Sequence, residues 1–361
     1  MARVLAHIEK IEWVQPIEGK DRIVLAGVLG WQVIVQKSDF NVGDKVVFCE
    51  IDSVFPEKPE YEFLRSKKFR IKTMKMAGVV SQGICFPLSI LPEGEYEIGQ
   101  DVTELMGITQ YEPTMDKEEV EPKDYQPKKK YPKWLMRMGW FRKLVLPKKQ
   151  QRGFPSFISK TDENRIQNCP FYLEQDLDWI ATEKVDGQSG SFTLQKIKGK
   201  HWWNKTTYDF AVCSRNLRKW NKDNSSFWSV AEKYNIENVL HKLIGDNEWV
   251  AIQGECCGTG IQGNKYHING YDLFVFNVIY PSGRMGSLEA KVLMESKGLK
   301  FVPIINEKIN IKGMSVNEVL DYATGKSVLY DTLREGIVFR TLDGKQSFKA
   351  VSPKFLMKFN E

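Results

Sequence analysis

The feature that most constrains this chain is a lysine placed between two apolar, strand-like runs. Residues 179–180 are apolar and lead into Thr182, Glu183 and Lys184, and after Asp186 and Gly187 a second β-rich run covers residues 191–194. This pattern predicts a strand, a sharp turn and another strand. A lysine at such a junction can act as a nucleophile if its pKa is lowered by burial or by positive neighbours. The alternative is an ordinary surface turn, and the blocks further along the chain bear on that choice.

The first 105 residues read as short strands separated by turns. The β-rich runs are residues 4–11, 23–28, 31–35, 46–48 and 83–88. Short strands at this spacing predict a small closed barrel, which we expect to be an OB-fold with an RNA-binding role. Between them lies a basic stretch that includes Lys67, Lys68, Arg70 and Lys72. We expect it to follow a nucleic-acid backbone, the alternative being a solvated strand or loop.

A change of composition marks residues 106–152 as a linker. Residues 112–124 are acidic, and a basic block follows that includes Lys128, Lys129 and Lys130. Trp134 and Trp140 are interleaved with this block, and residues 133–144 could form a short helix. The pattern favours an RNA-backbone contact, or a linker helix that docks its tryptophans on the next domain.

Residues 153–361 mix strands and helices, which predicts an α+β domain built on antiparallel sheets. The expected strands are residues 249–253, 271–279, 336–339 and 347–350. The expected helices are residues 227–234, 287–297 and 316–323. Residues 159–168 predict a capped helical turn near the start of the domain.

Composition describes an ordinary intracellular protein. Of the 361 residues, 42% are hydrophobic and 27% are charged, and the net charge is +6. The 6 cysteines form no C-x-x-C pair and the 4 histidines no metal motif, so we expect reduced thiols in a cytosolic or nuclear compartment, and we predict a cytoplasmic protein. The start is not a signal peptide, and no apolar run approaches the length that spans a membrane. We expect a monomer.

Further charged and aromatic blocks follow Lys184 at the ends of predicted strands, and together they supply the parts of a nucleotidyl transfer. Asp186, Glu255 and Glu335 could hold a divalent metal, Mg²⁺ or Mn²⁺, through its waters. Arg215 and Lys349 could place positive charge on phosphate oxygens. Phe276 could stack on a purine. Each block alone also suits a structural role, but their joint presence in this order favours catalysis.

The ordered set K-x-D-G, S-R-N, Q-G-E, F-V-F-N, E-G-I-V and S-F-K resembles motifs I, Ia, III, IIIa, IV and V of the covalent nucleotidyltransferases. Residues 159–168, SKTDENRIQN, resemble the signature at the front of ATP-dependent RNA ligases of the T4 RNA ligase 2 group. An OB-like module ahead of the ligase domain is similar to the RNA ligase family with an N-terminal OB domain. The resemblance implies an ATP-grasp-like ligase domain after the barrel.

The resemblance also implies an activity. ATP adenylates Lys184, AMP passes to an RNA 5′-phosphate, and a 3′-hydroxyl displaces AMP to leave a phosphodiester, in RNA repair such as that of broken tRNA. Lys184, Lys349 and Arg215 are the implied catalytic residues, and Asp186, Glu255 and Glu335 the implied metal site. The implied ATP-binding residues are Glu183, Lys184, Asp186, Gly187, Arg215, Phe276, Glu335 and Lys349, with Glu183 at the adenine edge.

One motif departs from the family pattern. Relatives carry two lysines spaced K-x-K in motif V, whereas here Ser347 takes the first place, with Lys345 or Lys354 as candidates for the missing charge. The alternative functions are a DNA ligase, a capping-type guanylyltransferase, or an RNA-binding protein with a decayed ligase domain. The first two continue into a C-terminal OB domain, for which the 12 residues after Lys349 leave no room. Decay of the ligase domain should have removed at least one of Lys184, Glu255, Glu335 and Lys349, and all four are present.

Overall fold

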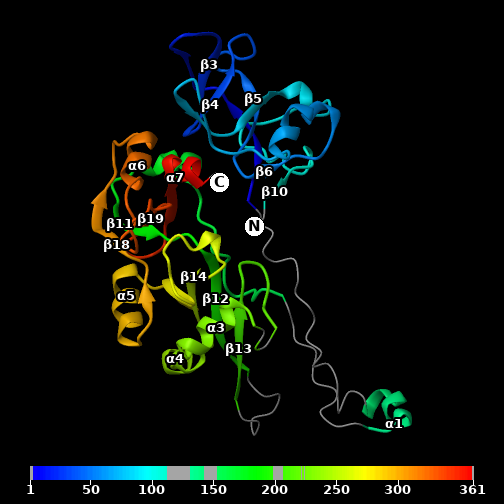
Figure 1. Cartoon of the computed structure of the whole chain (residues 1–361), viewed down its shortest axis with the longest axis vertical. Coiled ribbons are helices and arrows are strands. Elements are labelled where there is room, and N and C mark those ends of the chain that lie inside the picture. Colours follow the sequence, from blue (N-terminus) through cyan, green and yellow to red (C-terminus); the bar gives the residue numbers. More distant parts are fainter. Residues whose placement is uncertain are drawn as a thin grey trace.

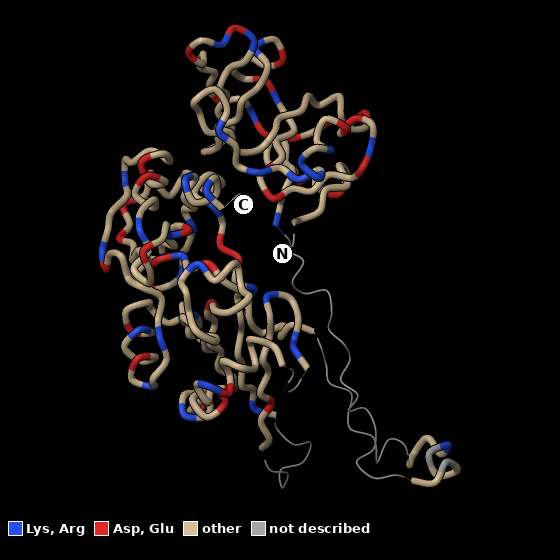
Figure 2. The backbone as a smooth tube through the Cα atoms, in the orientation of Figure 1, with Lys and Arg blue, Asp and Glu red and all other residues tan. Residues whose placement is uncertain are grey.

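Two domains stack along the long axis of the molecule (Figure 1). The structure is a computed structural model that describes residues 3–111, 131–141, 153–197, 206–220, 222 and 224–359. Lysine and arginine alternate with aspartate and glutamate along both domains (Figure 2). The net charge of +6 belongs to the whole sequence, which includes the basic residues 128–130 that lie outside the described residues. No helix in the described ranges is both long enough and apolar enough to cross a membrane.

The N-terminal domain is the expected small β-barrel. Its sheets have the orders β1-β5-β9, β2-β3-β4, β7-β8 and β10-β6, all antiparallel. The elements are β1 (Ala6–Lys10), β2 (Trp13–Ile17), β3 (Lys20–Val28), β4 (Trp31–Gln36), β5 (Lys45–Cys49), β6 (Ser53–Val54), η1 (Pro59–Lys67), β7 (Met74–Met76), β8 (Val79–Ser81), β9 (Ile84–Pro87), η2 (Leu88–Ile90) and β10 (Thr109–Gln110). Apolar residues of these strands fill the barrel with buried side chains such as Trp31 and Phe48.

The barrel domain reaches beyond the expected end at residue 105. Strand β10 pairs with β6, and the Tyr111 N–H donates to the Asp52 carbonyl at 2.8 Å. Near the other end of the chain, Val351 and Leu356 pack into the barrel's hydrophobic core. The two domains thus share a buried contact, and the division at residues 105 and 152 stays a prediction.

The ligase-side domain consists of two antiparallel sheets with helices on their outer faces (Figure 1). The larger sheet has the order β13-β12-β14-β15-β16 with β17 beside β15, and the smaller has the order β18-β11-β19-β20. The strands are β11 (Asp178–Lys184), β12 (Gln188–Ile197), β13 (Thr207–Cys213), β14 (Trp249–Gly258), β15 (Tyr271–Tyr280), β16 (Gly283–Arg284), β17 (Lys300–Phe301), β18 (Ile304–Asn310), β19 (Gly336–Thr341) and β20 (Ser347–Val351). The helices are η4 (Ile166–Asn168), η5 (Pro170–Leu173), α3 (Ser226–Lys233), α4 (Ile236–Leu243), η6 (Gln262–Asn264), α5 (Ser287–Ser296), α6 (Val316–Ala323) and α7 (Pro353–Phe359).

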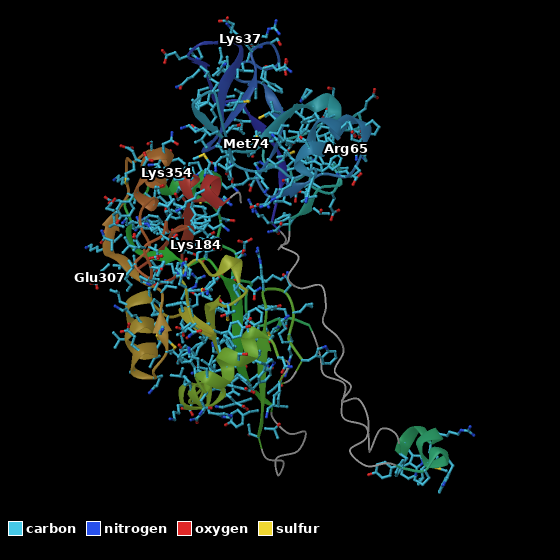
Figure 3. All side chains as sticks on the ribbon, in the orientation of Figure 1. Lys37, Arg65, Met74, Lys184, Glu307 and Lys354 are labelled. Atoms are coloured by element: carbon cyan, nitrogen blue, oxygen red, sulfur yellow. The ribbon has the colours of Figure 1, made fainter. Side chains whose placement is uncertain are left out.

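The chain crosses from the smaller sheet to the larger one between Lys184 and Gln188. A side chain at Gly187 would place its Cβ 2.4 Å from the Cys256 carbonyl oxygen and 2.7 Å from Cys257 Sγ. Only glycine therefore lets the backbone pass this close to β14. The crossing leaves Lys184 at the end of β11, where the two sheets meet (Figure 3).

The segment 159–168 differs from its prediction. Instead of a capped helical turn it is largely extended, and only η4 forms one 3₁₀ turn, without a side-chain cap. The reason is that its backbone pairs with β20: Lys349 N–H donates to the Asn164 carbonyl at 2.7 Å, and Arg165 and Lys349 form a parallel bridge. Strand pairing therefore takes the hydrogen bonds that a helix would have used.

The same segment joins the two domains. Trp31 Nε1 donates to Asn168 Oδ1 at 2.5 Å, and Asn168 Nδ2 donates to Glu50 Oε1 at 2.5 Å. Gly30 N–H donates to the Gln167 carbonyl at 2.9 Å. These bonds hold the barrel against the edge of the smaller sheet.

The linker is described only in part. Helix α1 (Lys133–Arg137) falls within the predicted helix, and Trp134 and Trp140 are 61% and 66% exposed. Within residues 131–141, then, neither tryptophan docks on the next domain as one interpretation expected. Lys128, Lys129 and Lys130 lie outside the described residues.

Candidate active site

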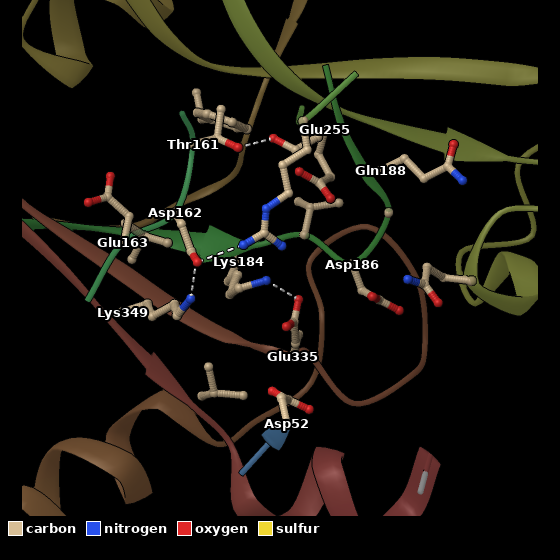
Figure 4. A pocket seen from close by; sticks show the side chains of 18 of the residues that line it. Asp52, Thr161, Asp162, Glu163, Lys184, Asp186, Gln188, Glu255, Glu335 and Lys349 are labelled. Atoms are coloured by element: carbon tan, nitrogen blue, oxygen red, sulfur yellow. Dashed lines mark hydrogen bonds and ion pairs between the residues drawn. The ribbon is translucent and has the colours of Figure 1, made fainter. Parts of the chain in front are cut away.

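A cavity of about 800 Å³ lies where the two sheets and the barrel meet. The ligase-side residues predicted from the motifs all line it: Glu183, Lys184, Asp186, Gly187, Arg215, Glu255, Phe276, Glu335 and Lys349. They come from different strands, so the fold brings together blocks that are far apart in the sequence. Figure 4 shows the central group, with Lys184 pointing to Glu335 and Lys349 to Asp162.

Carboxylates surround Lys184. Its Nζ donates to Glu335 Oε2 at 2.5 Å, and Glu335 directly precedes β19, the strand that pairs with β11. Burial opposes the charge on Lys184, but Glu335, Glu255 and Asp186 outweigh burial and raise the pKa of the lysine above its usual value. This arrangement stabilises the protonated amine. To make Lys184 a nucleophile, part of that negative charge must be offset.

Three carboxylates, Asp186, Glu255 and Glu335, surround the single cation Lys184. This excess of acidic groups suits a divalent metal. Burial, the largest effect, raises the pKa of Glu255 to about 8; Lys184 lowers it, and Glu335 and Asp186 raise it. No group of three or more His, Cys, Asp or Glu side chains in the described residues converges to hold a metal directly. The expected contact through metal-bound waters stays a prediction.

Asp186 has a cationic partner that the sequence interpretation missed. Lys265 Nζ donates to Asp186 Oδ2 at 2.5 Å, and the Asp186 N–H donates to Tyr266 Oη at 2.8 Å. Lys265 also lies 4.7 Å from the centroid of the Phe359 ring on α7. The loop that carries Lys265 follows β14, and no spacing or motif in the sequence connects it with Asp186.

One carboxylate holds both predicted phosphate-binding cations. Asp162 accepts from Lys349 Nζ at 2.7 Å and from Arg215 Nη2 at 2.6 Å. Burial would raise the pKa of Asp162, but Lys349 and Arg215 outweigh it and hold that pKa well below its usual range. Burial also lowers the pKa of Lys349 to about 8, against the opposing effect of Asp162. Asp162 belongs to the SKTDENRIQN segment, which the sequence interpretation used as a signature without assigning this residue a contact.

Glu183 and Phe276, the residues predicted to contact adenine, both line the cavity but have different partners. Glu183 lines the cavity, but its carboxylate accepts from Ser327 Oγ at 2.5 Å and from the Val328 N–H at 2.8 Å. It therefore fixes the loop ahead of Glu335, and its adenine contact stays a prediction. Phe276 lines the cavity, with the Arg340 guanidinium carbon 5.8 Å from its ring centroid.

Neither lysine proposed to replace the missing motif V charge lies in the cavity. Lys345 is exposed and pairs with Asp343 at 3.1 Å, and Lys354 is exposed on α7. Ser347 instead donates to Glu163 Oε2 at 2.5 Å. Arg340 also lines the cavity, and its Nη2 donates at 3.3 Å to Oε1 of Glu163, the carboxylate that Ser347 contacts.

The four basic barrel residues predicted to bind RNA separate into two pairs. Lys67 and Lys68 are exposed at the end of η1 and do not line the cavity. Arg70 and Lys72 do line it, and Arg70 is nearly buried, with Nη2 donating to Asp52 Oδ1 at 2.7 Å. The basic stretch is thus no continuous surface track, because the chain turns inward after residue 68.

A buried arginine beside the cavity suits an anionic ligand. Arg165 is 6% exposed and approaches Asp52 Oδ2 at 3.5 Å. Its Nε and Nη1 have no hydrogen-bond partner among the described residues. A buried guanidinium with unpaired nitrogens is costly unless an acceptor is provided, and phosphate oxygens are the acceptors that it matches best.

Comparison with known proteins agrees with this geometry. A family model described as RNA ligase matches residues 177–356, and an OB-fold domain model matches residues 5–88. No curated protein matches.

Solved structures of a Naegleria gruberi RNA ligase match nearly the whole chain. The form with PPi has a TM-score of 0.79 at 28% identity and covers 99% of each chain. A lysine-to-alanine mutant with ATP and Mn also has a TM-score of 0.79 at 28% identity, covering 99% of this chain and 98% of that one. A glutamate-to-alanine mutant with AMP and Mn has a TM-score of 0.78 at 28% identity, covering 99% of each. This chain belongs to the RNA ligases, with an OB-fold domain ahead of its ligase domain.

Proposed function

We propose that this protein joins RNA 3′-hydroxyl and 5′-phosphate ends with ATP, through a covalent adenylate on Lys184. The observation that carries the proposal is the convergence of Lys184, its surrounding carboxylates and the Asp162-bridged cations Lys349 and Arg215 in one cavity. Nucleotidyl transfer needs a nucleophile, carboxylates that would hold a metal to offset the charge around it, and cations for phosphate oxygens.

In the first step the neutral Lys184 Nζ attacks the α-phosphorus of ATP. A nitrogen–phosphorus bond forms as the bond between the α-phosphorus and the oxygen of the leaving pyrophosphate breaks; pyrophosphate takes the electron pair, and the attacking nitrogen releases a proton to solvent. Lys349, Arg215 and Arg165 bind phosphate oxygens. Asp186, Glu255 and Glu335 would hold Mg²⁺ or Mn²⁺ through its waters, and the metal would offset the negative charge that otherwise keeps Lys184 protonated.

In the second step an oxygen of the RNA 5′-phosphate attacks the AMP phosphorus, and the nitrogen–phosphorus bond to Lys184 breaks. In the third step the RNA 3′-hydroxyl loses its proton and attacks the RNA phosphorus, so that AMP leaves and a phosphodiester remains. The biological role that we propose is the repair of broken RNA such as tRNA, by a monomer in the cytoplasm.

The test is transfer of label from α-labelled ATP to the denatured protein in the presence of Mg²⁺ or Mn²⁺. We expect label on the wild type and on Lys242→Ala, a control at an exposed lysine of α4, and none on Lys184→Ala. Wild-type labelling of Lys184→Ala would place the nucleophile elsewhere. Label from GTP alone would instead indicate a capping-type guanylyltransferase.

Nicked RNA and DNA duplexes and single-stranded RNA then distinguish the substrates. Sealing of DNA in preference to RNA would contradict the proposed function. Absence of label from both nucleotides would favour a non-catalytic RNA-binding protein.

A further inference from the structure

The active-site cavity has a second wall, contributed by the barrel domain. Its members, called the OB wall below, are Arg3, Asp52, Arg70, Lys72, Gln110 and Tyr111. Asp52 points into the cavity near Glu335, facing the lysine–carboxylate group (Figure 4). The nucleotidyl-transfer roles proposed above use residues of the opposite, ligase-side wall. The OB wall therefore lines the active-site cavity, but none of its residues has a role in the steps proposed above.

A fixed aromatic ring lies at the centre of the OB wall. The Tyr111 N–H donates to the Asp52 carbonyl at 2.8 Å, and Asp52 Oδ1 accepts from Arg70 Nη2 at 2.7 Å. The Arg70 guanidinium carbon lies 3.5 Å from the centroid of the Tyr111 ring. Asp52, Arg70 and Tyr111 thus form one connected unit in which Arg70 packs against one face of the ring.

The backbone at Asp52 is strained, and strained backbone is common at functional sites. Asp52 has a φ of +73°, in the left-handed region that a non-glycine residue rarely adopts. The side chain of Arg70 is 11% exposed, whereas Tyr111 is 37% exposed. One face of the ring is therefore supported from within the protein, and a large part of the ring remains open to a ligand.

The chemistry of the OB wall matches an RNA end. Arg3, Arg70 and Lys72 carry positive charge; Arg3 pairs with Glu50 at 2.6 Å and Arg70 pairs with Asp52 at 2.7 Å. Cations beside an open aromatic ring suit a nucleotide, because the ring stacks on the base and the cations attract the phosphate. The strand that receives AMP must bring its 5′-phosphate into this cavity to reach Lys184.

We propose that the OB wall binds the 5′-phosphate-bearing RNA end, with the terminal nucleobase stacked on Tyr111 and its phosphate near Arg3 and Lys72. This inference rests on the proposed function and gives the barrel a direct role in AMP transfer. Phe276, on the ligase-side wall, remains the residue proposed to stack on the adenine of ATP. Tyr111 therefore contributes to the second step and not to the first.

The test compares Tyr111→Ala and Tyr111→Phe with the wild type, step by step. The first readout is lysine labelling by ATP. The second is AMP transfer from labelled enzyme to a 5′-phosphate RNA, and the third is sealing of an RNA adenylated beforehand. The control is Phe63→Ala, which removes an aromatic ring that is 56% exposed on η1, away from the cavity.

We expect Tyr111→Ala to lower kcat/KM for AMP transfer to RNA by roughly 5- to 150-fold, the range for loss of one stacked base. Lysine labelling and the KM for ATP should be unchanged, and Tyr111→Phe should retain transfer because the ring remains. Phe63→Ala should behave as the wild type in all readouts. Equal melting temperatures for the variants would exclude loss of the fold.

Other outcomes overturn the inference. Unchanged AMP transfer by Tyr111→Ala would show that the ring does not bind the RNA end. A defect confined to lysine labelling would place ATP on Tyr111, and a defect confined to the preadenylated RNA would assign the ring to the 3′-hydroxyl strand. A wild type that labels no lysine, or that transfers no AMP to RNA, would instead be a failure of the proposed function.

Discussion

Asp162 and Lys349 form an ion pair of 2.7 Å across 187 positions of sequence. The pair exists because residues 162–165 lie along β20, with the Lys349 N–H bound to the Asn164 carbonyl. The Asp162 carboxylate also holds Arg215, so it occupies both cations expected to meet phosphate. When nucleotide binds, we expect phosphate oxygens to compete with this carboxylate for the same donors.

Replacing Asp162 with asparagine should shift the alkaline limb of the adenylation rate to lower pH. Burial, Arg165, Arg3 and Lys184 all lower the pKa of Lys349, to about 8, and Asp162 is the group that opposes them. Without that carboxylate, protonated Lys349 should be lost at a lower pH. The measurement is the rate of lysine labelling between about pH 6 and 10 at saturating ATP. Asp176→Asn, at an exposed pair, should leave the profile unchanged, and a wild-type alkaline limb in Asp162→Asn would contradict the expectation.

Substituting Gly30 with alanine should loosen the contact between the two domains. An added Cβ would lie 2.7 Å from Gln167 Cα and 2.9 Å from Val316 Cγ2, closer than packed atoms approach. We expect lysine labelling to persist while RNA sealing falls, since the residues assigned to the adenylation of Lys184 all belong to the ligase-side domain. Limited proteolysis between the domains and sealing of nicked RNA measure the effect. The control is Gly94→Ala, where the nearest atom is 3.6 Å away; equal sealing by the two variants would count against a role for docking.

Replacing His7 with glutamine should flatten the dependence of stability on pH. Burial lowers the pKa of His7, but Glu50 and Glu9 outweigh it and raise the pKa from 6.5 to about 9. The folded state therefore binds the proton more tightly. This contribution is fully present below pH 6.5 and is lost as pH rises to about 9, with a size of up to ~3 kcal/mol. Urea unfolding at about pH 6, 7.5 and 9 measures it; a wild-type slope in His7→Gln would show that His7 is not the group responsible.

Replacing Lys265 with methionine should destabilise the protein, because it removes the ion pair with Asp186. The two side chains are 11% and 6% exposed, so the variant leaves a carboxylate buried without its cation. Breaking such a pair costs about 3 to 5 kcal/mol. Urea unfolding should show this loss, and Lys265→Arg should recover part of it by retaining the charge. If Lys265→Met unfolds at the same urea concentration as the wild type, the ion pair contributes nothing measurable.

Much of the fold follows from local pattern. The run that includes Trp31 buries every second residue, and the run that includes Val46 and Phe48 is apolar and buried throughout; both form barrel strands. Helix α6 coincides with residues 316–323, because Ser315 and Glu318 form a capping box that marks its start. The segment 159–168 departs from its pattern, since a neighbouring strand supplied better hydrogen-bond partners than a helical turn.

The sequence by itself determined the ligase-side half of the site. Lys184, Asp186 and Glu335 lie at or beside a strand end, whereas Glu255 and Lys349 lie within β14 and β20, and the type and order of these residues predicted their common site. Only the tertiary structure decided that Asp162 bridges two cations, that Lys265 pairs with Asp186, and that Asp52 and Tyr111 complete the cavity from the other domain. The physical reason is that strand alternation is a property of neighbouring residues, whereas these contacts depend on how sheets cross and domains dock.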